Sequence, residues 1–363
     1  MRVSKVNQFA NFKNKNNQNT GEFIPALYKE NNDIVSITKP SFKGENSEGS
    51  DKQTIIDKLN KIPFYKMRKK SDIIVSMTSP ETIQVTDKFA SSPKLAENKD
   101  VQEIMPFLLH YIVCPEQVDV SEKYLSEPDL YENDDLRYKF LNIVDYVQDE
   151  RTQSLALKFL STPEMYDNKG LQETMEKVLS YGCTDITFPL ANTFLDNADL
   201  YTNPNTQSNI GTTLKNCRTP EQAEVVGKLF ENPEAMNEKF VKLSFNNLLT
   251  HVDSKQKAQV VGDFLSAQSK PYEDKVIQSN IFSLVHKADT QEKADVLSKV
   301  FSNKAFIENK DLQQELVKII DTTDSKEKSE ERIKVLDSYL CSKGTVFEER
   351  LGEFVLNGWE CRY

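Results

Sequence analysis

The sequence contains few of the residues that usually carry catalysis or metal binding. Its 363 residues include only 3 His, 5 Cys and 1 Trp. The histidines, His110, His251 and His286, form no H-x-x-x-H pair, and Cys114, Cys183, Cys217, Cys341 and Cys361 form no C-x-x-C pair. Phosphate-binding and nucleophile motifs such as G-x-x-x-x-G-K-[ST], G-x-G-x-x-G and G-x-S-x-G are also missing. We therefore predict no catalytic residues, no metal site and no cofactor, and we expect that the protein is not an enzyme.

Long hydrophobic runs are missing too. The longest apolar stretch, residues 105–114, contains Pro106 and His110 and reaches only about half of a membrane span. The N-terminus has no apolar core of the kind found in a Sec signal peptide. An odd number of cysteines indicates free thiols in a reducing compartment. We expect a cytoplasmic protein without membrane contact, and secretion by a route other than Sec is the alternative.

Charge is distributed unevenly along the chain. Residues 1–79 contain 14 Lys or Arg and 8 Asp or Glu, a net charge of +6, whereas residues 80–363 contain 32 and 48, a net charge of -16. Because phosphate backbones are held by Lys and Arg, this acidic part disfavours nucleic acid as a partner. It favours a protein or peptide with a basic surface.

A repeat of about 35 residues organises most of the sequence. The unit is clearest over 219–254, where Ala223, Val226, Leu229 and Phe230 are spaced as one face of a first helix, and a second apolar pattern follows Pro233. The apolar pair recurs at steps of 35, 35, 35, 35, 35, 36 and 39 residues: Phe89-Ala90, Tyr124-Leu125, Phe159-Leu160, Phe194-Leu195, Leu229-Phe230, Phe264-Leu265, Val300-Phe301 and Tyr339-Leu340. The pattern predicts an all-α protein made of stacked helical hairpins.

Polar residues mark where the predicted helices begin and end. Pro93, Pro128, Pro163 and Pro233 end first helices, and Asn98, Asn133, Asn168 and Asn203 precede second helices as N-caps. Thr78, Thr184, Thr219, Ser254, Asp289 and Asp324 are the expected caps of first helices, and Thr219 with Gln222 and Asp289 with Glu292 have capping-box spacing. Gly227 and Gly262 lie inside first helices. Glycine inside a helix costs about 1 kcal/mol of stability relative to alanine. We therefore expect these two glycines to have a compensating role, which is to allow close approach of a neighbouring helix.

The two ends of the chain depart from the repeat. Residues 1–50 are rich in Asn, Lys, Ser and Gly and are expected to be a disordered, polar, basic arm. Residues 51–79 are expected to form degenerate capping helices, because Ile73 and Ile74 stand one repeat before Leu108 and Leu109. The solenoid is then predicted over 80–359, with a last unit around Trp359 as its C-terminal cap.

These hairpins resemble α-helical solenoids, and HEAT and armadillo-like arrays are the most similar in general appearance. Tetratricopeptide repeats are a poorer match, because their W-x-x-L-G-x-x-Y pattern is absent. The resemblance implies a superhelical solenoid of about eight hairpins with a long groove for a protein or peptide.

One column of residues is the candidate partner-binding site. It consists of Tyr111, Tyr146, Tyr181, Asn216, His251 and His286, spaced by 35 residues in the last turns of successive second helices. Tyr146 falls at the edge of the apolar face, where a side chain can bury its body and keep its polar tip in water. A row of such side chains is suited to an extended partner, although half-buried residues that seal the seam between units would give the same pattern.

We therefore predict a non-enzymatic protein-protein interaction scaffold. One alternative is a secreted effector that acts on host proteins, and a less favoured one is an RNA-binding helical-repeat protein.

Overall fold

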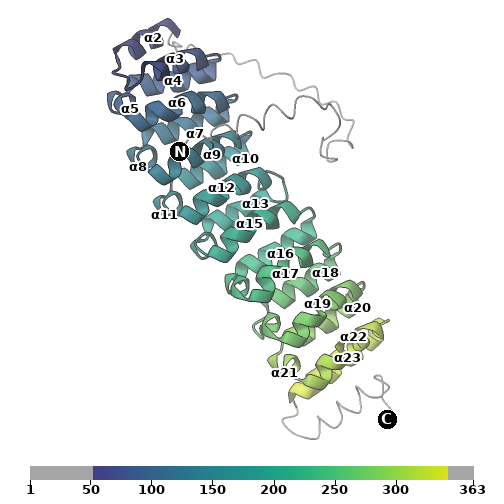
Figure 1. Cartoon of the computed structure of the whole chain (residues 1–363). Coiled ribbons are helices and arrows are strands. Elements are labelled where there is room, and N and C mark those ends of the chain that lie inside the picture. The colour runs from purple at the N-terminus through teal and green to yellow at the C-terminus, as the bar shows by residue number, and fades with distance from the viewer. Residues whose placement is uncertain (1–51, 342–363) are drawn as a thin grey trace, which may run out of the picture. The chain divides into compact units, whose positions relative to one another are not determined.

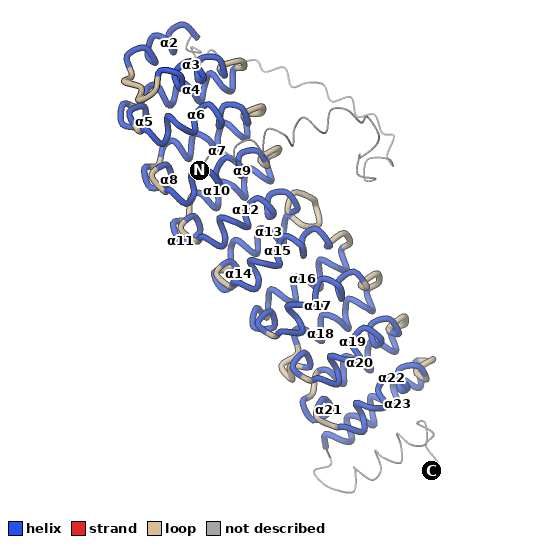
Figure 2. The backbone as a smooth tube through the Cα atoms, in the orientation of Figure 1, coloured by secondary structure: helices blue, strands red, loops and turns tan. Residues whose placement is uncertain are grey.

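The computed structural model describes residues 52–341, and all regular structure in this range is helical. Figure 2 shows helices joined by short loops, and no strand occurs in this part of the chain. The prediction of an all-α protein is thereby confirmed for the described residues. The arm expected at 1–50 and the cap expected around Trp359 lie outside them.

The first helices of the units carry the recurring apolar pair or lead into the array. These helices are α2 (Lys52–Lys61), α4 (Pro80–Ser91), α7 (Pro115–Ser126), α10 (Glu150–Leu160), α13 (Phe188–Asp196), α16 (Pro220–Glu231), α18 (Lys255–Ser266), α20 (Gln291–Phe301) and α23 (Lys326–Cys341). In α16, Thr219 and Gln222 form the predicted capping box, and Leu229 and Phe230 are buried. The same pair is buried from α7 to α20. The 35-residue pattern thus identified core positions correctly.

The second helices are α3 (Met67–Ser76), α6 (Lys99–Tyr111), α9 (Asp134–Asp145), α12 (Lys169–Tyr181), α15 (Pro204–Asn216), α17 (Lys239–Thr250), α19 (Lys275–Lys287) and α22 (Lys310–Asp321). All four predicted asparagine caps are confirmed, because the side-chain oxygens of Asn98, Asn133, Asn168 and Asn203 accept from free backbone N–H groups in the first turn. Asp274 and Asn309 cap α19 and α22 in the same way.

A short third helix occupies the turn that we expected to be a simple break. These helices are α5 (Pro93–Glu97), α8 (Pro128–Tyr131), α11 (Pro163–Tyr166), α14 (Ala198–Tyr201), η1 (Pro233–Asn237), η2 (Pro271–Glu273) and α21 (Lys304–Ile307). Proline ends the preceding helix but also favours the first position of a new one. Two consecutive buried side chains then anchor each short helix, such as Leu130 and Tyr131 in α8. Each unit from α4 to α22 is therefore a hairpin with an extra helical turn.

A recurring glutamine joins the short helix to the second helix, and sequence reasoning missed it. Gln172 donates from Nε2 to the carbonyl of Tyr166 at 2.5 Å, and Gln278 donates to the carbonyl of Tyr272 at 2.6 Å. The same bond, six residues back along the chain, is made by Gln102, Gln207 and Gln313. It supplies a partner for a carbonyl that the short helix leaves free.

Contacts between consecutive units arrange these helices in two rows. In one row, α2, α4, α7, α10, α13, α16, α18, α20 and α23 contact one another in chain order. The second helices contact in the same order from α3 to α17 and again from α19 to α22, with their weakest contact between α17 and α19. The short helices lie along one edge of these rows, as α5, α8 and α11 show (Figure 1), and α14 continues the same edge (Figure 2).

Three predicted caps are displaced by one residue. Ser79 rather than Thr78 caps α4, Thr290 rather than Asp289 caps α20, and the Ser325 side chain accepts from the backbone of Lys328. Asp289 and Asp324 instead pair with lysines four residues later, at 2.7 and 2.8 Å. The expected box between Asp289 and Glu292 is therefore wrong, because the aspartate was already engaged by a lysine.

The predicted role of two glycines is also wrong. A Cβ atom at Gly227 would meet nothing within 4 Å, and one at Gly262 would only touch the Lys228 side chain at 3.4 Å. Close approach occurs elsewhere, at Gly182 and Gly211, where a Cβ would lie 2.7 Å or less from neighbouring atoms.

Candidate binding surfaces

The structure places all six column residues at equivalent points of the second helices. Tyr111, Tyr181 and Asn216 are the last residues of α6, α12 and α15, Tyr146 and His251 are the C-caps of α9 and α17, and His286 is in the last turn of α19. The tyrosines and Asn216 are half-buried, whereas both histidines are exposed. We call these six residues the ladder.

Several ladder side chains interact with the next unit. Glu176 of α12 raises the pKa of Tyr146, and the Lys215 Nζ of α15 lies 5.8 Å from the ring centroid of Tyr181. The ring of His251 meets Phe282 of α19 edge-on, with centroids 5.7 Å apart. The ladder residues therefore cover the seams between units with part of each side chain.

Electrostatics around the ladder are set by carboxylates. Burial raises the pKa of Tyr146, and the nearby Glu176 and Asp145 raise it further because phenolate would be repelled. Tyr181 also contributes, so these two tyrosines are close enough to influence each other. His251 instead places Nδ1 2.9 Å from the carbonyl of Asn247 in its own helix. This arrangement can provide aromatic surface and hydrogen bonds to a partner, and it holds no nucleophile paired with a base.

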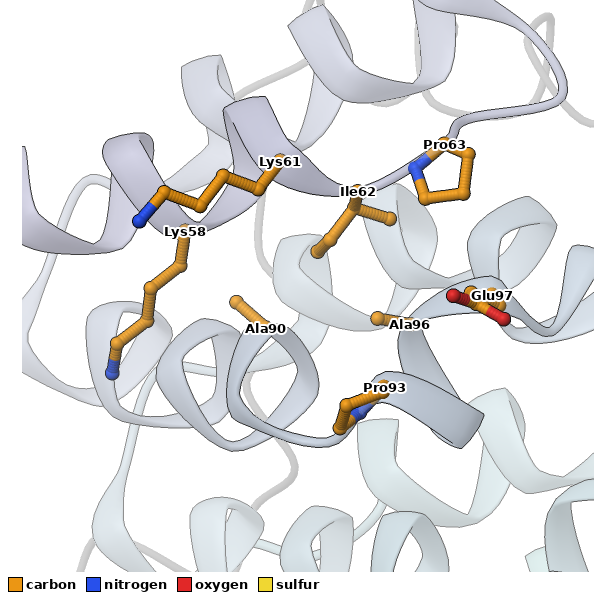
Figure 3. Close-up of a pocket in the computed structure, with 8 residues that line it drawn as sticks. All are labelled: Lys58, Lys61, Ile62, Pro63, Ala90, Pro93, Ala96 and Glu97. Atoms are coloured by element: carbon orange, nitrogen blue, oxygen red, sulfur yellow. The ribbon is translucent and has the colours of Figure 1, made fainter.

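A small hollow lies beside the first described unit. Figure 3 shows Ile62 between the lysines of α2 and Glu97 of α5, above Ala90, Pro93 and Ala96. The hollow has a volume of about 220 Å³. It occurs where α2 and α3 are joined by residues 62–66 without a short helix. Lys58 at its rim already pairs with Asp87 at 2.6 Å.

A larger, open hollow of about 510 Å³ lies between α3 and α6. Its lining includes Lys66, Arg68, Phe107 and His110, and Phe107 is half exposed. Burial lowers the pKa of Lys69, whose ammonium pairs with Glu103 at 2.9 Å and lies 5.2 Å from the Phe107 ring. The basic run at 66–70 is thus partly neutralised by its own neighbours.

One buried polar group departs from the repeat and was not singled out in the sequence. Tyr124 occupies the position of Phe89 and Phe159, and its ring stacks on Phe140 with centroids 3.8 Å apart. Its hydroxyl is buried and has no hydrogen-bond partner among the described residues, nor has Nε of Arg137. Arg137 replaces the recurring glutamine of other units and pairs with Asp100 at 3.0 Å. In the sequence, this site could have been recognised because Tyr124 and Arg137 both differ from the residues at the aligned positions of other units.

The described part of the chain holds no cluster of His, Cys, Asp or Glu that could bind a metal ion. Cys114, Cys183 and Cys217 are free thiols, and burial raises the pKa of Cys217 to about 11. Within 52–341, none of the helices combines the length and apolarity that crossing a bilayer requires.

Comparison with known proteins finds no matching family model, curated protein or solved structure.

Proposed function

We propose that this protein is a non-enzymatic scaffold that binds a protein or an extended peptide. In this proposal the units form a superhelical solenoid of about eight 35-residue repeats, with the partner in its groove. The two rows of contacting helices support that architecture. We also place the protein in the cytoplasm, where its free thiols would stay reduced.

The observation that carries the proposal is the ladder. Equivalent side chains recur at the ends of six consecutive second helices, from Tyr111 to His286. Aromatic residues with a buried body and a polar tip supply large contact area at low entropic cost, and they are enriched at protein interfaces. A repeated row of them offers the same contact to successive parts of one extended partner.

The test compares three versions of the full chain as baits in a quantitative pull-down from native lysate. The ladder variant carries Tyr146→Ala, Tyr181→Ala and His251→Ala. The control variant carries Phe107→Ala, Tyr138→Ala and Leu243→Ala, which remove other exposed apolar side chains of second helices. Thermal melting shows first that both variants are folded.

Loss of the same specific partners with the ladder variant alone supports the proposal. Equal recovery by all three baits means that the ladder only seals seams. Loss with the control variant alone moves the binding surface to the exposed apolar side chains of α6, α9 and α17. Recovery of no protein above background by the wild-type chain contradicts the scaffold function itself.

A further inference from the structure

The edge formed by the short helices differs sharply between the middle and the ends of the array. The windows 126–133, 161–168 and 196–203 together contain seven Asp or Glu and no Lys or Arg. The aligned window 231–238 also contains three Glu and no Lys or Arg, but Glu231 and Glu234 pair with Lys228 and Lys270, at 3.1 and 3.6 Å. In the three middle windows only Glu127 and Asp196 pair with a lysine of the described chain, at 3.4 and 2.7 Å. Negative charge without a neighbouring cation is therefore concentrated on α8, α11 and α14. We call this surface the acidic edge.

Most carboxylates of the acidic edge are not neutralised within the protein. Asp129, Glu132, Glu164 and Asp199 are exposed and have no ion-pair or hydrogen-bond partner for their carboxylates among residues 52–341. Asp167 accepts only an amide hydrogen bond, from Nδ2 of Asn133 in the preceding unit at 3.1 Å. Because like charges repel, a cationic partner would relieve the repulsion.

Three tyrosines on this edge have buried rings and hydroxyls that reach solvent, where a ligand could accept from them. Tyr131, Tyr166 and Tyr201 end α8, α11 and α14, and they are only 6%, 7% and 7% exposed. Their hydroxyls have no hydrogen-bond partner in the described part of the chain. The equivalent Tyr272, outside the acidic edge, has one, because its hydroxyl lies 3.2 Å from Nδ2 of Asn232.

The Tyr166 hydroxyl lies among carboxylates of two units. Burial raises the pKa of Tyr166, and surrounding negative charges raise it further. These charges belong to Asp129, Asp167, Glu127 and Glu164, so α8 and α11 share one site. Tyr131 is similarly influenced by burial and by Glu132. Protonated hydroxyls beside free carboxylates can donate to a carbonyl while the carboxylates bind a cation.

We infer that the acidic edge binds an extended, arginine- or lysine-rich segment of a partner protein, with one cationic side chain for each of α8, α11 and α14. This inference rests on the proposed scaffold function and names a different surface from the ladder. Packed helices are spaced by about 10 Å, and a segment in the polyproline II conformation advances by about 3.1 Å per residue with three residues per turn, so that every third side chain lies on the same face. The matching segment therefore has a cation at every third residue, and its free carbonyls accept from the tyrosines.

The protein's own N-terminal segment is a poorer match for the acidic edge. Residues 1–50 contain seven Lys or Arg and five Asp or Glu, so their net charge is only +2. Nowhere in this segment do three cations follow one another at three-residue spacing. Charge complementarity thus favours a partner in trans.

The test measures fluorescence anisotropy of two labelled peptides with the full chain at low and physiological salt. One peptide is (Gly-Ser-Arg) repeated five times, and the other has the same composition with its five arginines adjacent. The edge variant carries Asp129→Asn, Glu164→Gln and Asp199→Asn. A matched control carries Asp145→Asn, Glu224→Gln and Asp311→Asn, which remove three unpaired carboxylates elsewhere.

We expect the spaced peptide to bind the wild-type chain more tightly than the clustered one. The edge variant should bind it about tenfold more weakly, because three exposed charge pairs each contribute little alone. The control should stay within about twofold of wild type. A third variant with Tyr131→Phe, Tyr166→Phe and Tyr201→Phe keeps the rings and the charge, and it should also weaken binding severalfold.

Equal weakening by the edge and control variants would show attraction to net charge alone and would overturn the inference. So would absence of peptide binding, or carbodiimide cross-links from Lys13 or Lys15 to Glu164 in the peptide-free chain. If these results occur while the ladder variant still loses partners in the pull-down, only the acidic edge is refuted. The scaffold function then stands on the ladder.

Discussion

The side chain of Gln102 should be worth more to stability than any equivalent glutamine of the array. It is fully buried, and its Nε2 donates to the carbonyls of Ala96 at 2.7 Å and Pro63 at 3.3 Å. Its Oε1 accepts from the backbone N–H of Tyr65 at 3.1 Å. One amide thus joins α5, α6 and the connection between α2 and α3. Gln278, by comparison, makes only the bond to the Tyr272 carbonyl.

The proposed pair of substitutions is Gln102→Leu and Gln278→Leu, which keep similar volume and remove the amide. A hydrogen bond contributes about 0.5–1.5 kcal/mol net, and a buried group left without a partner costs about 1–3 kcal/mol. Three bonds, one of them buried, correspond to about 3 kcal/mol and the single bond to about 1 kcal/mol. Gln102 is fully buried and Gln278 is half-buried, so leucine gains more from burial at position 102. The difference is therefore up to about 2 kcal/mol, which equals up to about a 30-fold change in an opening equilibrium.

Hydrogen exchange with mass spectrometry measures this difference, because array proteins open locally and not only as a whole. Peptides covering 62–76 and 93–105 should lose more protection in Gln102→Leu, by up to about 30-fold, than peptides covering 271–287 lose in Gln278→Leu. Peptides from α20 and α22 serve as an internal reference in the Gln102 variant. Equal losses for the two variants, or no loss for Gln102→Leu, would refute the reasoning that the number of hydrogen bonds made by the side chain decides the effect.

Four further predictions concern single sites. Gly227→Ala should stabilise the protein by about 0.5–1 kcal/mol in urea unfolding, since no atom opposes a Cβ there; a loss of stability would contradict the open environment. Asn98→Ala should cost about 1 kcal/mol because it caps α6, whereas Glu238→Ala should change little because Glu238 caps nothing. Tyr124→Phe should leave stability unchanged or raise it by about 1 kcal/mol, because the lost hydroxyl has no partner; destabilisation would reveal one. Cys217, with a pKa raised to about 11 by burial, should form thiolate about 100-fold less than an ordinary thiol at pH 8 and resist alkylation in site-resolved mass spectrometry. Its contribution to stability should be complete below pH 9 and lost as the pH rises through about 11.

Structural roles that recur at a fixed spacing in the sequence could be predicted from the sequence. The buried pair of each first helix and the four asparagine caps follow from periodicity and from the local geometry of a helix start, and neither requires knowledge of distant contacts. The displaced caps show the limit of this reasoning. Whether Asp289 or Thr290 caps α20 depends on a competing ion pair with Lys293, and sequence spacing allows both.

The glutamine bond and the short helix were not predicted because each depends on the other. A run such as Pro128-Asp129-Leu130-Tyr131 is too short to form a stable helix alone. It becomes one when Leu130 and Tyr131 are buried. Gln172 shows its role only once the carbonyl of Tyr166 is seen beside it. Aligning the units and comparing the residue six positions after the last buried residue of each short helix would have found the glutamines. It would not have shown the carbonyl to which they bind.

The sequence alone determined the helical class, the 35-residue unit, the buried pairs and the position of the ladder at second-helix ends, because these follow from local periodicity and chain connectivity. Only the tertiary structure decided how much of each ladder side chain is exposed and which carboxylates remain without a partner. The sequence does not distinguish Asp129 from Asp135, but in the structure Asp135 pairs with Lys169 at 2.8 Å, whereas Asp129 lies near the Tyr166 hydroxyl. Pairing of charges depends on the distance between side chains of neighbouring units, and the sequence of a single repeat does not determine that distance.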